Sequence, residues 1–232
     1  MPEPNAALRL LWGPPARPTR GPKPSLSLES IARAGVGVAD AEGLAAVSMQ
    51  RVAGLLDHTK MALYRYVPGK AELVALMVEH AAGDPPPASD APWREQLADW
   101  AHRMSAVLAA HPWLLDALAA PRPTGPRELA WLERVVAALD GHGLSGAERM
   151  DAAVLLVGHV RTIAAQHRQS RDGSPEAELL RALGDLVQTH ADRYPALAAA
   201  LAEPPGGRDD AYDFGIARIL DGIAALIDHR TR

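Results

Sequence analysis

Hydrophobic and polar positions along this chain repeat with the spacing of α-helices. In residues 28–39 the apolar side chains recur at the first position and three, four, seven, ten and eleven positions later, which places them on one helical face. No segment alternates with the period of two that marks a half-buried strand. We therefore predict an all-α fold, with later helices at about 70–82, 92–110, 112–119, 126–141, 145–170, 175–202 with a break near Pro195, and 209–229.

Prolines divide the chain into three predicted parts. Residues 1–25 are rich in proline, which denies the hydrogen bonds of helix and strand, so we expect a flexible or extended arm. The arm carries four cations and one acid, and it either lies in a DNA minor groove or is a solvated tail. The run Pro85–Pro87 then separates a small domain at 26–82 from a larger helical domain at 88–230.

Two short helices joined by a tight turn are predicted within Val47–Lys70. Ser48 and Thr59 stand where N-cap side chains accept backbone amides, and Val47 is placed to pack on Val52 as a hydrophobic staple. The second helix directs two aliphatic side chains, four positions apart, toward the core. Its opposite side is left outward, where a helix-turn-helix presents residues to base edges and phosphates.

The segment 28–81 resembles the N-terminal domain of the tetracycline-repressor (TetR) family, whose members are DNA-binding regulators. One departure is Asp57, where the family usually has Gly, followed by His58 in place of an aliphatic residue. Because Asp tolerates a left-handed conformation better than most residues, we expect the turn to be kept. The resemblance rests on Glu42-Gly43-Leu44, Val47-Ser48-Met49, Val52-Ala53, Met61-Ala62-Leu63-Tyr64-Arg65-Tyr66-Val67, and Lys70 followed by Glu72-Leu73.

The resemblance and the outward side of the second helix indicate the same candidates for DNA contact. Gln is suited to adenine, Lys to guanine, and Met or Ala to the thymine methyl group. Arg51 and Arg65 fit either group of contacts or are solvated surface charges. The candidates for base edges are Gln50, Lys60, Met61 and Ala62, and those for the phosphate backbone are Ser48, Thr59, Tyr64, Tyr66 and Lys70.

Charge is distributed unevenly along the chain. Residues 1–80 hold nine of the 24 Lys and Arg residues and seven of the 28 Asp and Glu residues, so the rest of the chain carries the negative excess. All three lysines, Lys23, Lys60 and Lys70, lie in this first part. The N-terminal part therefore suits a polyanion such as a double-stranded DNA operator, while a genome rich in G+C is the competing explanation for the lack of Lys elsewhere.

The last predicted helix carries a wide apolar face, which suits contact with a second subunit. DNA recognition also favours two subunits, because one short recognition helix buries too little surface for specific binding, whereas two copies read half-sites one helical turn apart. We therefore expect a homodimer that selects a palindromic operator, and an ordinary buried terminal helix is the alternative. The family resemblance implies a dimer built from helices at 145–170 and 209–229. The candidate interface residues are Tyr212, Ile216, Ile219, Ile223 and Leu226.

The resemblance also implies an effector site in the larger domain. The chain has one Phe but five Trp, so indole rings there are candidates for lining an apolar pocket that takes a small apolar or amphipathic molecule. An ordinary core role is the alternative for each residue, and a regulator with no small-molecule effector is the alternative function. The candidates are Trp100, Met104, Trp113, Trp131, His159, Thr162 and Gln166.

No pattern in the sequence supports an enzyme, a cofactor or a metal site. The chain has no Cys, and it lacks the G-x-S-x-G, H-E-x-x-H and phosphate-loop motifs. The pairs His102 with His111 and His159 with His167 are not spaced like the i, i+4 ligands of one helix. No apolar run reaches the roughly 18 residues of a membrane span, so we expect a cytoplasmic protein with no membrane partner.

Overall fold

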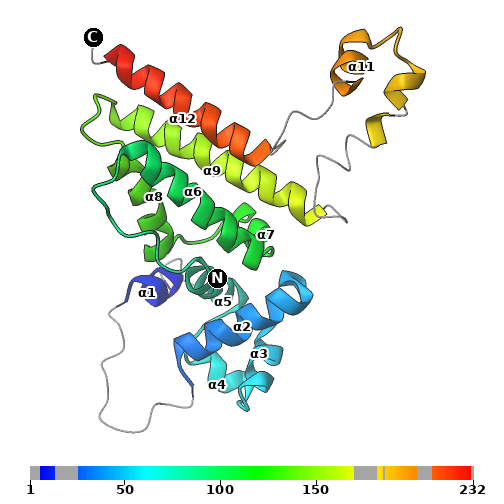
Figure 1. Cartoon of the computed structure of the whole chain (residues 1–232). Coiled ribbons are helices and arrows are strands. Elements are labelled where there is room, and N and C mark those ends of the chain that lie inside the picture. Colours follow the sequence, from blue (N-terminus) through cyan, green and yellow to red (C-terminus); the bar gives the residue numbers. More distant parts are fainter. Residues whose placement is uncertain (1–5, 14–25, 170–181, 185, 203–210, 231–232) are drawn as a thin grey trace. The chain divides into compact units, whose positions relative to one another are not determined.

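The computed structural model describes residues 6–13, 26–169, 182–184, 186–202 and 211–230. Within these residues the regular secondary structure is helical, without a strand, which confirms the predicted all-α class (Figure 1). The chain divides into two compact units, Met1–Asp140 and Gly141–Arg232. None of the described helices is both long enough and apolar enough to cross a bilayer.

A helix-turn-helix module opens the main part of the first unit. Ser48 Oγ accepts a hydrogen bond from the amide of Arg51 and Thr59 Oγ1 accepts one from the amide of Ala62, each at 3.2 Å. These are the two caps that the sequence predicts, and they set where the two short helices begin. The module consists of α2 (Leu28–Glu42), the 3₁₀ turn η1 (Leu44–Ala46), α3 (Met49–Leu55) and α4 (Lys60–Tyr64).

The next helix, α5 (Lys70–Ala82), packs against α2 and closes the core of this module. Leu63 and Val67 are fully buried, as their four-residue spacing predicts. Gly35 of α2 lies so close to α5 that a Cβ on it would be 2.7 Å from Met77 Sδ. The glycine that weakens α2 as an isolated helix therefore allows the two helices to pack closely.

Three further helices complete the first unit: α6 (Trp93–Ala110), α7 (Leu114–Ala119) and α8 (Pro126–Ala138). The buried rings of Trp100 and Trp131 meet edge to face, with 5.7 Å between their centroids. Trp100 Nε1 donates to the Trp131 carbonyl at 2.8 Å, and Trp131 Nε1 donates to the carbonyls of Ala82 and Gly83 at 3.2 Å. Because buried indole N–H groups need acceptors, these bonds tie α6, α8 and the end of α5 together.

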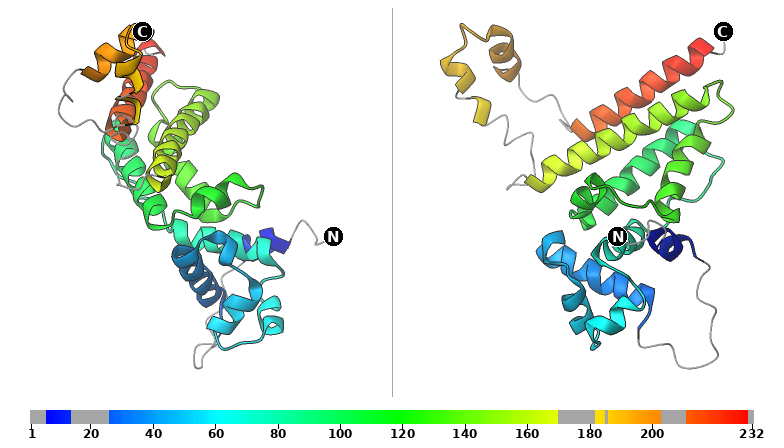
Figure 2. Two further views of the ribbon diagram at one scale, coloured as in Figure 1. Left: turned by 90° about the vertical axis from the view of Figure 1, so that its right-hand side faces the viewer. Right: turned by 180° about the vertical axis from the view of Figure 1, so that it is seen from behind.

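The second unit is built around α9 (Gly146–Gln169) and α12 (Ala211–Arg230), which pack against each other. Figures 1 and 2 show the two helices side by side in all three views. Glu148, in the first turn of α9, accepts from the amide of Ser145 at 2.8 Å and pairs with Arg230 at the end of α12. A shorter helix, α11 (Pro195–Ala202), begins at the proline where the sequence predicts a break.

The N-terminal arm differs from its predicted extended form. Residues Ala6–Trp12 form the helix α1, which packs against α5. This stretch contains no proline, and Leu10 and Leu11 are half-buried, so they gain apolar contact that an extended chain in water would not provide. Residues 1–5 and 14–25 of the predicted arm lie outside the described residues, as do the first residues of the helix predicted at 175–202.

Glu148 is expected to make an acid-sensitive contribution to stability. The Arg230 guanidinium and the hydrogen bonds from Ser145 lower the pKa of Glu148 from 4.5 to about 2. A carboxyl group with a lowered folded-state pKa stabilises the protein above its unfolded-state pKa, and this contribution is lost as the pH falls. We expect Glu148→Gln to be less stable than the wild type near neutral pH, with the difference in urea unfolding free energy closing between pH 4.5 and 2.

The matched control is Glu133→Gln, which removes an exposed carboxylate of α8 and is expected to leave the pH profile of stability unchanged. A difference between wild type and Glu148→Gln that stays constant with pH would contradict this account of the Glu148 carboxylate.

Candidate DNA-binding surface, dimer face and effector site

The ten residues predicted to contact DNA lie on α3, on α4 and around the start of α5. Eight of them are exposed, and the other two, Ala62 and Tyr64, are half-buried. Met61 is 72% exposed, whereas Leu63, two positions later, is fully buried. Because α4 holds its inner side in the core, its outer side presents polar and flexible side chains to solvent at a defined position.

Cations on this surface differ in how they are held. Lys60 Nζ lies 5.5 Å from the centre of the Tyr64 ring, in a cation–π contact. Arg51 instead pairs with Glu42, and both side chains are more than two-fifths exposed. An exposed ion pair of this kind contributes at most about 1 kcal/mol, so Arg51 can exchange Glu42 for a phosphate at small cost. Within the described part of the chain, Lys70 makes no ion pair.

The turn between α3 and α4 is kept despite the missing glycine. Asp57 has φ of 57°, and it is the one non-glycine residue with positive φ in the described part of the chain. This is the left-handed conformation that the sequence predicts for it. Leu55, at the end of α3, is 60% exposed on the same side as Gln50 and Arg51. Sequence reasoning overlooked Leu55 because leucine is usually a core residue.

The four effector candidates of the first unit lie on α6 to α8, and three of them have the surroundings of core residues. Trp100, Trp113 and Trp131 are buried, and Trp113 Nε1 donates to Asp40 Oδ1 at 2.7 Å. Met104 is half-buried on α6. Trp100 also borders a cavity of about 370 Å³ whose other walls include Glu95, Asp99, Arg103 and Arg134.

The three remaining effector candidates lie on α9, in the second unit. Thr162 and Gln166 are exposed, and His159 is half-buried. His159 Nε2 lies 3.0 Å from the Tyr212 carbonyl oxygen, and the two rings stack with centroids 6.0 Å apart. A Cβ on Gly215 would be 2.1 Å from the imidazole. The imidazole therefore joins α9 to α12 at a point where only glycine leaves room for it.

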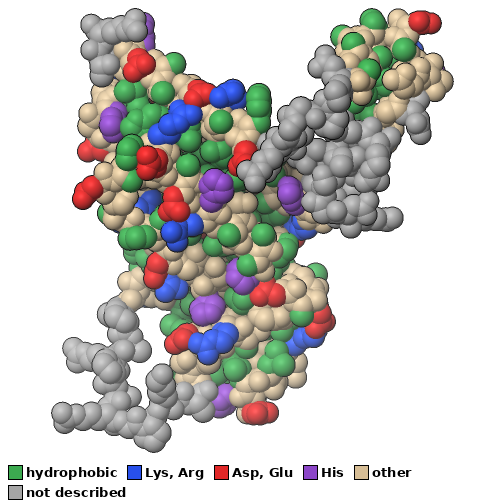
Figure 3. All heavy atoms as spheres, viewed as in Figure 1, with side chains coloured by type: hydrophobic (Ala, Val, Ile, Leu, Met, Phe, Trp, Pro, Cys, Tyr) green, Lys and Arg blue, Asp and Glu red, His purple; other side chains and the backbone are tan. Residues whose placement is uncertain are grey.

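The predicted dimer face divides between the interior and the surface of the second unit. Tyr212, Ile216 and Ile223 are 9%, 4% and 6% exposed, because α12 packs against α9 of the same chain. For these three residues, burial against the same chain is what the alternative of an ordinary buried terminal helix predicts, and their role in an interface between two copies stays a prediction. Ile219 and Leu226 are half-buried. Figure 3 shows hydrophobic and charged side chains mixed over this region, and the large exposed apolar residues of the pair are Met150, Val154, Leu155 and Phe214.

Titratable side chains in the described part of the chain form no group of three that could hold a metal ion. His80 of α5 has its pKa lowered, first by burial and then by the nearby Arg33 and Arg127 cations, and both effects favour the neutral imidazole. Glu79, beside it, is the one buried charged side chain among the described residues, and its carboxylate is bonded to α8. The Glu79 carboxylate thus joins α5 to α8.

Comparison with known proteins identifies the family. The model of the tetracyclin repressor-like C-terminal domain matches residues 86–227. The HTH-type transcriptional repressor DrrR1 of Streptomyces coeruleorubidus is 37% identical over 233 residues, which cover 96% of this chain and 86% of that protein.

Solved structures share the fold. ActR of Streptomyces coelicolor in complex with actinorhodin has a TM-score of 0.74 at 24% identity, over 87% of this chain and 98% of that one. The regulator SCO7222 of Streptomyces coelicolor has a TM-score of 0.66 at 22% identity, over 88% of this chain and 98% of that one. With the family model and the repressor DrrR1 matching most of its length, the chain belongs to the tetracycline-repressor (TetR) family of transcriptional regulators, whose members are not enzymes.

Proposed function

We propose that this protein is a cytoplasmic repressor that binds a palindromic operator as a homodimer and releases it when a small apolar or amphipathic effector binds. The observation that carries the DNA-binding part is the exposed side of α3, α4 and the start of α5. There, the candidate side chains for base edges and phosphates are exposed or half-buried, while Leu63 and Val67 behind them are fully buried. The relationship to the repressor DrrR1 supports the same reading.

The proposed docking places α4 in the major groove. Its N-terminal residues Lys60 and Met61 are exposed at the end that a helix-turn-helix directs toward base edges. Tyr66 and Lys70 are exposed just beyond α4, where they suit the phosphate backbone. Gln50 and Arg51 extend the same exposed surface along α3.

The proposed homodimer uses the outer sides of α9 and α12. Val154 and Leu155 of α9 are 67% and 60% exposed, and Phe214 of α12 is 65% exposed. Exposed apolar residues concentrated on one helix pair mark an interaction surface. Two copies related by a two-fold axis would present their recognition helices to half-sites about 34 Å apart, which is why the target is a palindrome.

The proposed effector response draws its support from a structural neighbour of this chain. ActR, which shares the fold, was solved in complex with actinorhodin. An effector that binds one conformation of this chain more tightly than another would shift the spacing of the two DNA-binding modules. A regulator with no small-molecule effector is the alternative function.

Two lysine substitutions test the DNA-binding surface. We expect Lys60→Ala, at a base-edge position, to cost about 1 to 3 kcal/mol and to relax sequence preference at one position of each half-site. Lys70→Ala, at a phosphate position, should weaken all sequences alike and reduce the salt slope by about one per subunit. Titrations of matched and mismatched palindromes at several salt concentrations measure both effects. Unchanged affinity in both variants would refute the assignment of this surface to DNA.

A charge on the exposed side of α9 tests the dimer. Val154→Glu would bury an unpaired carboxylate in the proposed interface, which costs several kcal/mol, so we expect monomers in light scattering and loss of operator binding. Leu129→Glu, on an exposed apolar residue of α8, is the matched control and should remain a dimer. Ile223→Glu is unsuitable because Ile223 is buried within its own chain. A dimeric Val154→Glu protein would place the interface elsewhere.

A thermal-shift screen of small apolar and amphipathic compounds tests the effector response. We expect a compound that raises the Tm to release operator DNA, and a hundredfold loss of affinity requires about 2.7 kcal/mol of coupling. Met104→Trp, which fills space on α6, should abolish the response while DNA binding persists. A compound that stabilises the protein but leaves operator affinity unchanged at saturation would favour the effector-independent regulator.

A further inference from the structure

Beyond this function, the geometry points to Glu79 as a positioning residue for DNA binding: we propose that it locks α5 to α8, so that the two helices move as one rigid body. The phosphate-contact end of α5 then follows any displacement of α8. This inference rests on the proposed DNA-binding function, because its consequence is the position of Lys70.

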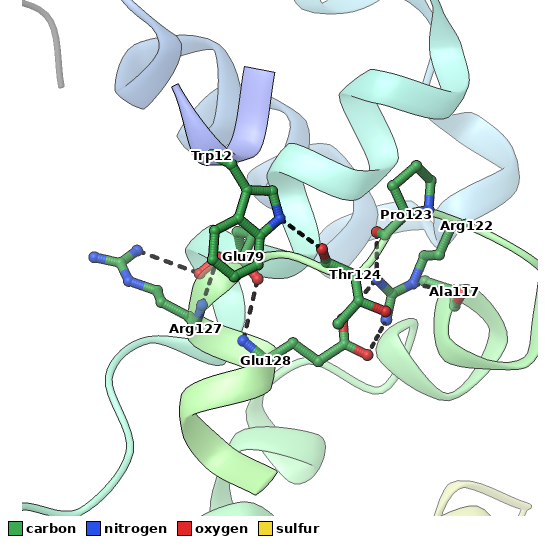
Figure 4. A network of polar contacts seen from close by, with 8 residues as sticks. All are labelled: Trp12, Glu79, Ala117, Arg122, Pro123, Thr124, Arg127 and Glu128. Atoms are coloured by element: carbon green, nitrogen blue, oxygen red, sulfur yellow. Dashed lines mark hydrogen bonds and ion pairs between the residues drawn. The ribbon is translucent and has the colours of Figure 1, made fainter. Parts of the chain in front are cut away.

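The Glu79 carboxylate supplies the missing cap of α8. Its Oε2 accepts from the amide of Arg127 at 2.9 Å and its Oε1 accepts from the amide of Glu128 at 3.2 Å (Figure 4). Amides in the first turn of a helix have no partner within the helix, and the helix dipole favours a negative charge there. The N-cap residue of α8 is Gly125, which has no side chain to satisfy them.

The same contact is reinforced from the α8 side. Arg127 Nη1 donates to the Glu79 carbonyl at 3.2 Å, and Arg127 Nε donates to Asp84 Oδ1 at 3.0 Å. A Cβ on Gly125 would lie 2.2 Å from the Glu79 carboxyl group. Glycine is therefore required at this position for the carboxylate to reach the helix end.

A second contact caps α5 from α8. Trp131, one turn beyond the start of α8, donates its indole N–H to the carbonyls of Ala82 and Gly83 at the end of α5. Each helix thus satisfies the free backbone groups of the other. Because the two contacts involve different turns of α8, they resist both sliding and rotation of one helix against the other.

The N-terminal helix α1 contacts both α5 and the loop that leads into α8. α1 packs against α5, and Trp12 Nε1 donates to the Thr124 carbonyl, in the loop just before α8, at 3.0 Å (Figure 4). A segment from the start of the chain therefore contacts α5 and the entry to α8 at once. Both contacts favour the same arrangement of α5 and α8 that Glu79 holds.

A tilt of α5 at Glu79 displaces Lys70 at the other end of the helix. Glu79 and Lys70 are nine residues apart, or about 13 Å along a helix that rises 1.5 Å per residue. A tilt of about 10° at the locked end therefore moves Lys70 by about 2 Å, enough to break a hydrogen bond to a phosphate. Since coupling is reciprocal, DNA that fixes Lys70 must also restrain the first turn of α8.

Amide hydrogen exchange of the full-length protein tests the lock, using a palindromic operator selected from random DNA. In the wild type we expect operator DNA to slow exchange of the Arg127 and Glu128 amides by about fivefold or more. Glu79→Gln removes the charge, and Gly125→Ala removes the space for the carboxylate. Both variants should lose this slowing while the amides of α3 and α4 remain protected by DNA. If one variant fails to fold, the other still tests the contact.

Glu148→Gln is the matched control. Like Glu79→Gln, it removes a carboxylate that accepts a backbone amide at the start of a helix, but that helix is α9 and not α8. It should lower stability and keep the slowing at α8, which separates transmission from a general loss of stability. Slowing that persists in both Glu79→Gln and Gly125→Ala would overturn the lock. So would a wild type that binds operator DNA with no change at α8, whereas a wild type that binds no DNA would overturn the proposed function itself.

Discussion

Burial of α5 on several sides is the constraint on which the first unit depends. This helix packs against α2 of the helix-turn-helix module and against α7 and α8, so the apolar residues Leu73, Ala75 and Met77 are fully buried. A helix enclosed in this way has little surface left for polar groups. Its one buried acid, Glu79, is accommodated because it meets the free amides of α8. The requirement to satisfy that carboxylate links the helix-turn-helix module, through α5, to α8.

The short helices α3 and α4 depend on tertiary packing more than on their own propensity. α3 and α4 are seven and five residues long, and helices of this length are unstable alone in water. Local caps from Ser48 and Thr59 set where they begin, and burial of Leu63 and Val67 holds them in place. The position of the exposed surface of α4 therefore follows from its packing against α3, which packs in turn against α2.

In the second unit, a glycine makes room for a polar side chain between two helices. Gly215 lets the imidazole of His159 reach the backbone of α12, so a polar side chain helps to fasten an otherwise apolar helix pair. Burying one stripe of α12 in this pair leaves Phe214 exposed, together with Val154 and Leu155 of α9. The pair is thus a folded element with an apolar surface still to cover, which is the property that the proposed homodimer uses.

The sequence by itself determined the helical class, the two caps of the helix-turn-helix and the left-handed turn at Asp57, because each depends on residues a few positions apart. It also identified the family, and it named candidate DNA contacts that the structure leaves exposed or half-buried. Only the tertiary structure decided that Ala6–Trp12 is a helix on α5, that Glu79 caps α8, and that Tyr212, Ile216 and Ile223 are covered by their own chain. An apolar stripe or a lone carboxylate has the same local pattern whatever covers it. The partner that decides its role lies tens of residues away, where helical periodicity carries no information.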